Sequence, residues 1–305
     1  MEADFLRWLR ERTPRYPGLS LGLTDDAALV DLAGVGQIVA TVDMLTDEID
    51  FRLAEVDPRR VGRKALAVNL SDLAAMAARP LAALVAVALP REGAAELARQ
   101  LCEGMLPLAA EFAMPLAGGD TNVWDGPLVI SVTALGVPSA GRALTRSGAR
   151  PGDQILVTGH FGGSLAGHHF DFQPRIREAC YLNEHYPLRA GIDVSDGLSL
   201  DLARLAEASG CGACLDLRLT PISQAARDAS LQRPESGSPL DHALGDGEDF
   251  ELILAAPPEA AKRMLADPDV GAPLTRIGEF VAEPGLWQTE ADGRRAPLTP
   301  RGWEH

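Results

Sequence analysis

Apolar residues recur at helical spacing between residues 57 and 80, which predicts one long helix there. Asp57 suits the N-cap, Pro58 suits the first helical position, and Pro80 is expected to end the helix. One face of this helix carries Val61, Ala65, Val68, Ala75 and Met76. The pattern therefore predicts a helix with one apolar face turned toward a core.

Asp72 falls in the middle of this apolar face. A bare carboxylate there costs on the order of several kcal/mol unless it is paired or bound to a cation. Asp72 is therefore either a satisfied buried residue, which caps a turn or pairs with an arginine, or part of a metal or phosphate site. Four further acidic motifs, described below, favour the metal or phosphate site.

Strand-like and helix-like segments alternate along the rest of the chain. In the first half, a turn that enters a strand is predicted at 21–30. Strands are predicted at 36–44, 81–89, 115–117 and 128–137, and helices at 1–18 and 92–112, the latter disturbed at Pro107. In the second half, strands are predicted at 154–158, 191–194, 213–217, 249–255, 274–280 and 286–289, and helices at 165–186, 198–209 and 257–265. Ser195 or Asp196 is expected to cap the helix at 198–209, and residues 231–239 are expected to form a loop.

The segment 138–153 is rich in Gly, Arg and Pro, which marks a domain boundary. A chain of 305 residues is also long for one ordinary domain. We therefore expect two domains, residues 1–140 and 141–305. Both halves mix strands and helices, so the predicted fold class is α/β.

Composition narrows the possible functions. The chain is 46% hydrophobic and 23% charged, which is typical of a soluble globular protein. Its net charge of −15 argues against a nucleic-acid partner, because phosphate backbones recruit basic surfaces. No apolar run approaches the length of a membrane helix, and the charged N-terminus does not resemble a signal peptide. We therefore expect a cytoplasmic protein without a membrane partner.

Several common catalytic motifs are absent from the sequence. It contains no G-x-x-x-x-G-K-[ST], no G-x-G-x-x-G after a strand and no G-x-S-x-G. Cys211 and Cys214 have C-x-x-C spacing without a second pair or a nearby histidine, which favours two small half-buried thiols beside a helix end over a zinc or redox site. A P-loop enzyme, a Rossmann dehydrogenase and a serine hydrolase are therefore disfavoured.

Acidic motifs lie instead at predicted turns, strand ends and helix starts. Besides Asp72, they are Asp25-Asp26, Thr41-Val42-Asp43, Gly118-Gly119-Asp120 and Asp193-Val194-Ser195-Asp196-Gly197. Each motif alone is common in turns and caps. Carboxylates from many separated segments that meet at one point are, however, what a metal-dependent phosphoryl-transfer site requires. Their combination predicts such a site.

The motifs also resemble those of a known family in their order along the chain. They are TDDAALV, TVDML, KALAVNLSDLAAM, GGDT, GPLVISVTALG, GRALTRSGARPGD, IDVSDGLSLDL, GEDFEL and RGWEH. This order resembles the thiamine-monophosphate kinase family, which belongs to the superfamily of aminoimidazole ribonucleotide synthetase and selenophosphate synthetase. The resemblance covers nearly the whole chain.

The resemblance implies a PurM-like architecture of two domains. In it, an N-terminal α+β domain binds ATP and Mg²⁺ and pairs its mixed sheet with a second copy in a homodimer, and the C-terminal domain is an α/β layer. It also implies direct transfer of the γ-phosphoryl group of ATP to thiamine monophosphate, assisted by several Mg²⁺ ions. No general base is expected, because the attacking phosphate oxygen is already anionic.

By motif position, the residues that resemble metal ligands are Asp26, Thr41, Asp43, Asp72, Asp120, Asp193 and Asp196. Those that resemble ATP contacts are Gly119, Asp120, Arg146 and Ser195. Glu248 and Trp303 resemble substrate contacts. From the residues alone, Arg146 suits either a phosphate or a boundary salt bridge, Glu248 suits either a substrate or a turn, and Trp303 suits either stacking on a thiamine ring or a hydrophobic plug.

The chain departs from the family pattern mainly on the acceptor side. Asp50 stands where the family usually has a histidine that contacts substrate, and Val42 replaces a residue that often carries a hydroxyl ligand. The stretch between Arg146 and Asp193 is also shorter than usual. Two alternatives to the kinase follow: an ATP-using enzyme of the same fold with another phosphorylated acceptor, and a weakly active nucleotide-binding homologue.

Overall fold

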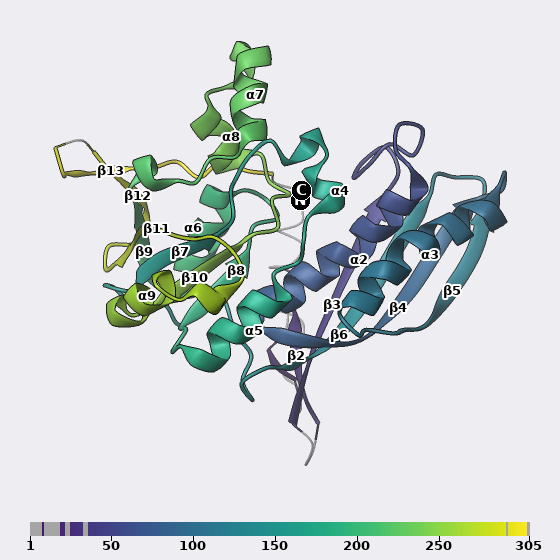
Figure 1. Ribbon diagram of the computed structural model, residues 1–305, viewed down its shortest axis with the longest axis horizontal. Coiled ribbons are helices and arrows are strands. Elements are labelled where there is room, and N and C mark those ends of the chain that lie inside the picture. Colours follow the sequence, from purple (N-terminus) through teal and green to yellow (C-terminus); the bar gives the residue numbers. More distant parts are fainter. Residues whose placement is uncertain (1–7, 9–18, 22–24, 33–35, 291, 304–305) are drawn as a thin grey trace.

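The computed structural model describes residues 8, 19–21, 25–32, 36–290 and 292–303. The helix predicted at 1–18 lies outside these residues apart from Trp8. The described part of the chain forms two sheets, and helix α2 (Pro58–Ala75) contacts strands of both (Figure 1). In that part, no helix combines the length and the apolar character needed to cross a membrane.

The first sheet is mixed, with strand order β1-β2-β3-β6-β4-β5 among the described residues. β4 and β5 are parallel, and the other neighbouring strands are antiparallel. The bounds are Leu19–Leu21 for β1, Ala28–Leu32 for β2, Gly36–Thr46 for β3, Ala78–Pro90 for β4, Leu116–Trp124 for β5 and Val129–Pro138 for β6.

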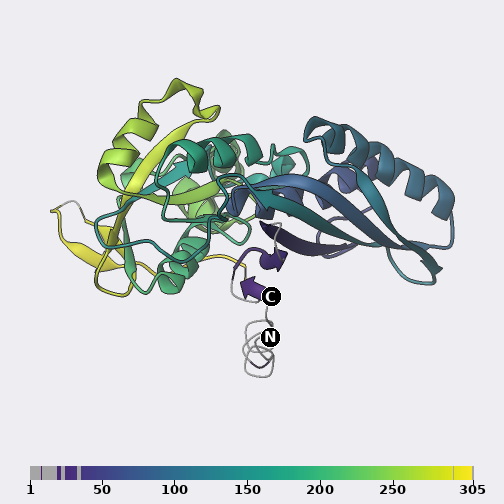
Figure 2. The ribbon, with the colours of Figure 1, turned by 90° about the horizontal axis from the view of Figure 1, so that it is seen from below.

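Helices α2 and α3 (Ala94–Glu111) cover one face of this sheet. The two helices approach each other closely at Gly62 and Gly104. A Cβ at Gly62 would lie 2.0 Å from the Leu101 carbonyl oxygen, and one at Gly104 would lie 1.8 Å from the Arg59 carbonyl oxygen. We call the opposite face the outer face. Figure 2 shows it without a helix over it among the described residues.

The predicted α2 is confirmed, but its end was assigned to the wrong residue. Asp57 caps the N-terminus by accepting a hydrogen bond from the Arg59 amide, and Met76 is the C-cap. Pro80 does not end the helix, because it already lies inside β4. The chain turns at Ala77, which has φ +48°, and then pairs with β6.

The GGDT segment is also placed differently from the prediction. It was expected just beyond a short strand at 115–117, whereas β5 continues to Trp124 and includes Asp120. Parallel pairing with β4 gives these residues backbone partners. Gly119 is required by this pairing, because a Cβ there would lie 1.7 Å from the Val85 carbonyl oxygen.

The second sheet has the strand order β13-β12-β9-β11-β7-β10-β8 in the described part of the chain. The bounds are Gln154–Thr158 for β7, Ala190–Asp193 for β8, Gly212–Leu215 for β9, Leu252–Ala256 for β10, Leu274–Val281 for β11, Gly285–Thr289 for β12 and Arg295–Pro297 for β13. Only β9 and β12 pair in parallel among these neighbours. Cys211 and Cys214, beside and within β9, are free and buried.

Helices pack around the second sheet. They are α4 (His168–Asp171), α5 (Ile176–His185), α6 (Leu198–Ala208), α7 (Gln224–Gln232), α8 (Pro239–Gly245) and α9 (Pro258–Leu265). Helices α7 and α8 were not predicted from the sequence, and residues 231–239 were expected to form a loop. Ser223 caps α7, and Ser238 forms a capping box with Asp241 at the start of α8.

The N-cap predicted for α6 was wrong, because the capping side chain comes from within the helix and not from the residues before it. Gly197 is the N-cap residue and has no side chain to accept a hydrogen bond. Asp201, inside the first turn, accepts instead from the Asp196 and Gly197 amides, at 2.9 and 3.0 Å. The predicted end of this helix is confirmed, because Gly210 follows it with φ +69°.

Candidate active site

Three carboxylates meet where the two sheets approach α2. Asp26 precedes β2, Asp72 lies on α2, and Asp193 is the last residue of β8. Each offers an oxygen within 4.8 Å of an oxygen from the others. We call Asp26, Asp72 and Asp193 the carboxylate cluster.

Two further predicted residues lie beside this cluster. Alternation along β3 places Thr41 and Asp43 on the face that α2 covers, opposite Ala134 and Val132 of β6. The Thr41 hydroxyl donates to Asp72, and the Ser71 hydroxyl donates to Asp193 at 2.5 Å. The cluster therefore already has hydroxyl donors, each of which stabilises a charged carboxylate.

The cluster nevertheless holds more negative charge than these donors balance. Burial, together with repulsion from neighbouring carboxylates, raises the pKa of Asp72 and that of Asp193 well above their usual range. Burial also raises the pKa of Asp43 to about 6. One buried oxygen of Asp26, Oδ2, has no hydrogen-bond partner. This donor set fits a hard divalent cation, which takes oxygen ligands and favours the ionised form of each carboxylate.

Arg146 borders the cluster from the segment between the sheets. Its guanidinium forms an ion pair with Asp26 at 2.5 Å, and its amide donates to Asp25 at 3.0 Å. The Arg146 carbonyl in turn accepts from the Ser209 hydroxyl at 3.0 Å. The boundary salt bridge considered from sequence is therefore present, and it places a forked donor next to the cluster.

A second group of predicted residues surrounds the GEDFEL segment. Glu248 forms an ion pair with Lys64 at 2.7 Å, and its backbone has φ +53°. The Lys64 ammonium also donates to the Asp50 carbonyl, at 3.0 Å. The Asp50 side chain points elsewhere and accepts from the Thr46 amide at 2.7 Å. Asp50 therefore contributes its backbone to this group and its carboxylate to a turn.

The C-terminal RGW segment joins the two loops that follow β8 and α8. The Trp303 amide donates to the Asp196 carbonyl, and its indole nitrogen donates to the Asp246 carbonyl, each at 3.0 Å. The Trp303 residue is 58% exposed, so it is not a buried plug. Its ring is available for stacking.

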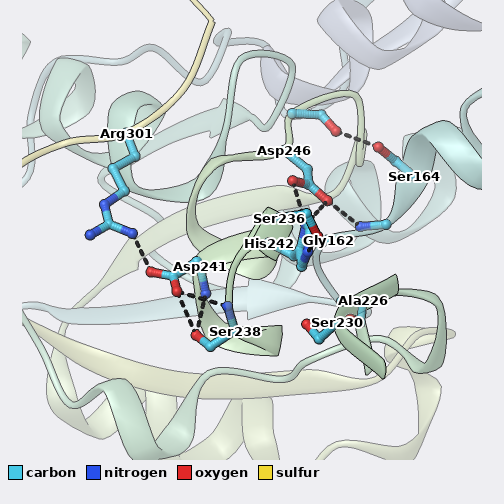
Figure 3. Close-up of polar contacts among 12 residues, drawn as sticks. Gly162, Ser164, Ala226, Ser230, Ser236, Ser238, Asp241, His242, Asp246 and Arg301 are labelled. Atoms are coloured by element: carbon cyan, nitrogen blue, oxygen red, sulfur yellow. Dashed lines mark hydrogen bonds and ion pairs between the residues drawn. The ribbon is translucent and has the colours of Figure 1, made fainter. Parts of the chain in front are cut away.

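Polar contacts fix the loop that holds Asp246. Figure 3 shows the Asp246 carboxylate close to the His242 ring, and the Ser164 hydroxyl pointing toward this loop. Asp246 accepts from the Gly163 amide at 2.7 Å, and Ser164 donates to the Gly247 carbonyl at 2.5 Å. Arg301 pairs with Asp241 on α8, which anchors the segment that carries Trp303.

Not all predicted residues reach the cluster within one chain. Gly119 and Asp120 lie on β5 at the edge of the first sheet, where Asp120 pairs with Ala86 and shares its exposed outer face. Asp196 is engaged with Arg204, and Ser195 accepts from the Glu248 amide at 2.6 Å. Val42 also points to the outer face and is 61% exposed, so a hydroxyl at this position would point away from the cluster.

Lys64 and Ser71 were not among the site residues predicted from the sequence. Lys64 lies two helical turns before Asp72 on the same face of α2, so a second charge within the apolar stripe was a usable signal. Ser71 had no comparable signal, because its partner Asp193 is 122 residues away in the chain.

Comparison with known proteins first defines the class. The family model for the N-terminal domain of AIR synthase related proteins matches residues 24–138. The family model for their C-terminal domain matches residues 126–286. The structure of AaThiL complexed with AMPPCP and TMP has a TM-score of 0.82 and 25% identity over 99% of this chain and 95% of that chain. The expected α/β, PurM-like architecture is confirmed.

Closer relatives then identify the family. The thiamine-monophosphate kinase of Rhodopirellula baltica is 44% identical over 100% of this chain and 97% of the relative. That of Escherichia coli K12 is 36% identical over 94% and 92%. The crystal structure of thiamine-monophosphate kinase from Stenotrophomonas maltophilia K279a has a TM-score of 0.69 and 33% identity over 96% of each chain. The chain belongs to the thiamine-monophosphate kinase family of enzymes.

Proposed function

We propose that this chain transfers the γ-phosphoryl group of ATP to the phosphate of thiamine monophosphate and releases ADP and thiamine diphosphate. The observation that carries the proposal is the carboxylate cluster, in which burial and repulsion between carboxylates raise the pKa of Asp72 and that of Asp193. Its family membership and the likeness to AaThiL complexed with AMPPCP and TMP support the donor and the acceptor.

The residues divide into two sides in this proposal. On the donor side, Asp26, Thr41, Asp43, Asp72 and Asp193 hold Mg²⁺, with Asp196 nearby, and Arg146 and Ser195 contact ATP. Bound Mg²⁺ neutralises phosphate oxygens, which lowers the barrier to phosphoryl transfer. On the acceptor side, Glu248, Trp303 and the Asp50 turn bind thiamine monophosphate.

Positioning is the main task of the protein in this reaction. The attacking atom is an anionic phosphate oxygen of the acceptor, so no side chain has to remove a proton from it. The new bond forms between this oxygen and the γ-phosphorus as the bond to ADP breaks, in line with it. Arg146 suits the growing charge on the phosphate oxygens, because its guanidinium donates from a planar fork.

We also propose that the protein is a homodimer that pairs the outer faces of its first sheets. This face exposes Val42 and Met44 of β3, Leu84 of β4 and Val137 of β6. Asp120 lies on the same face, away from its own cluster. In a dimer it would therefore serve, together with Gly119, the ATP and metal site of the partner subunit.

Mixing two inactive variants tests this shared site. Asp72→Asn and Asp120→Asn homodimers should each be inactive, whereas exchange of subunits creates one intact site in each heterodimer. Random exchange should restore about a quarter of the wild-type activity. A mixture that stays inactive, although mass measurement shows heterodimers, contradicts the assignment of Asp120 to the partner's site.

Product analysis tests the function itself. The protein is incubated with ATP, Mg²⁺ and thiamine monophosphate, and the thiamine phosphates are separated and quantified. We expect thiamine diphosphate and ADP in equal amounts. ADP without thiamine diphosphate would favour another phosphorylated acceptor, and ATP binding without turnover would favour the weakly active homologue.

Because the co-substrate is ATP, we propose the cytoplasm as the place of action.

A further inference from the structure

Lys64 is a fully buried lysine at the junction of the two domains. Its residue exposure is 0%, although lysine is almost never completely buried without a charged partner. Lys64 comes from α2 of the N-terminal domain, and its partner Glu248 lies 184 residues later, in the C-terminal domain. The pair therefore joins the two domains beside the acceptor side.

The contacts of Lys64 use its whole ammonium group. Nζ donates to both carboxylate oxygens of Glu248, at 2.7 and 2.9 Å, and to the Asp50 carbonyl, at 3.0 Å. The Phe170 ring lies 5.4 Å from Nζ and closes another side. With three acceptors for three donors, the ammonium has no proton left for a ligand.

Glu248, in contrast, remains open on one side. Its side chain is 25% exposed, and each of its oxygens keeps a further lone pair. Its backbone has φ +53°, which a non-glycine residue adopts only where the surroundings enforce it. Its amide donates to the carbonyl of Ser195, within the DVSDG segment, at 2.6 Å. Backbone and side chain of Glu248 are thus fixed from two directions.

We propose that Lys64 is a positioning residue for the phosphoryl acceptor. It holds the Glu248 carboxylate and the Asp50 carbonyl in the orientation that the acceptor meets, and it makes Glu248 one half of a neutral ion pair. This inference rests on the proposed function, in which Glu248 contacts thiamine monophosphate. Lys64 itself contacts no substrate and does not act on ATP.

Lys64→Met tests this role, and the only other lysine, Lys262, provides a matched control. Lys262 is exposed on α9, whereas Lys64 is the lysine that donates to Glu248 and to the Asp50 carbonyl. Steady-state kinetics are measured with each substrate varied in turn, and thermal unfolding is followed for every variant. We expect Lys64→Met to raise the KM for thiamine monophosphate by about tenfold to a hundredfold, because a displaced Glu248 no longer matches the acceptor. The KM for ATP should stay within about twofold of the wild type, since the cluster is not altered.

A double-mutant cycle with Glu248→Gln separates positioning from general stability. If Lys64 acts through Glu248, the double variant should be little worse than the poorer single variant. Additive effects, equal losses for both substrates, or wild-type kinetics in Lys64→Met would each overturn the proposal. Should Lys64→Met fail to fold, Lys64→Gln is measured instead, because its amide still donates to the Asp50 carbonyl. A wild-type protein that makes no thiamine diphosphate would instead reject the proposed function.

Discussion

The carboxylate cluster and the Lys64–Glu248 pair differ in how the negative charge of their carboxylates is balanced. Both place carboxylates at the junction of the two domains. Glu248 has its counter-charge within the protein, because both of its oxygens accept from a buried ammonium. Asp72 and Asp193 accept hydrogen bonds from hydroxyl groups and lie close to other carboxylates. Burial and the repulsion between these carboxylates raise the pKa of both residues.

This difference favours Asp72 and Asp193 over Glu248 as the carboxylates that would bind a cation in the proposed function. A carboxylate that already has a lysine is oriented for hydrogen bonding and does not require a metal. A group of mutually repelling carboxylates is stabilised when a divalent cation binds, and this gain is lost when the cation leaves. The same comparison separates Asp196, which is paired with Arg204, from Asp72 and Asp193.

Removing one charge from the cluster should have the largest effect. We expect Asp72→Asn to lower kcat by on the order of 1,000-fold, because the remaining carboxylates hold the cation less well. The fold should persist, as judged by circular dichroism and thermal unfolding. Asp125→Asn is the control, because Asp125 is an exposed aspartate paired with Arg91. Unchanged turnover in Asp72→Asn would contradict its assignment as a metal ligand.

The metal-free protein should show the repulsion directly in its pH dependence. The folded pKa of Asp72 is raised above the usual 3.8, so above pH 4 the unfolded chain binds fewer protons than the folded one. The unfolding free energy of the wild type should therefore fall with rising pH, relative to Asp72→Asn, by up to about 1.4 kcal/mol per pH unit.

This stability difference is measured by urea unfolding with a chelator present, between pH 4 and pH 7. Asp43, whose pKa is raised to about 6, also lowers the unfolding free energy as the pH rises through this range. Mg²⁺ should reduce the pH dependence, because it favours the ionised carboxylates. A wild type that gains stability relative to Asp72→Asn as the pH rises would show that the cluster is not repulsive.

The Asp50 turn should respond more weakly than either charged group. Asp50→Ala removes the acceptor of the Thr46 amide and should lower the unfolding free energy by about 1 kcal/mol. Its backbone carbonyl still accepts from Lys64, so the KM for thiamine monophosphate should rise less than in Lys64→Met. Asp47→Ala is the control in the same loop, because Asp47 also accepts from backbone amides. A larger rise of KM in Asp50→Ala would show that its carboxylate binds the acceptor.

The smallest effect is expected at Val42, next to a residue that faces the cluster. Val42→Thr should leave the Mg²⁺ concentration for half-maximal activity within about twofold, because this side chain lies on the outer face of β3. Thr41→Val, its neighbour, removes the hydroxyl that donates to Asp72 and should raise that concentration. Equal responses of the two variants would show that the two faces of β3 are not distinguished at the site.

The sequence alone determined features that depend on short stretches of chain. The α2 helix follows from its apolar period and its Asp57 cap, and strand β7 from a short apolar run. The order of the acidic motifs along the chain was enough for the resemblance to the family. The two missed helices, α7 and α8, begin at serine caps inside a polar segment, where the apolar period that marks α2 is weak.

Only the tertiary structure decided which charges meet and which side chains point away. The contacts of Ser71 with Asp193 and of Lys64 with Glu248 join residues 122 and 184 positions apart, so no local pattern contains them. The outer-face position of Asp120 follows from the pairing of β5 with β4, and not from its glycine-rich surroundings. Local periodicity fixes the elements because it reflects contacts within a few residues, whereas the balance of buried charge is set where distant segments pack together.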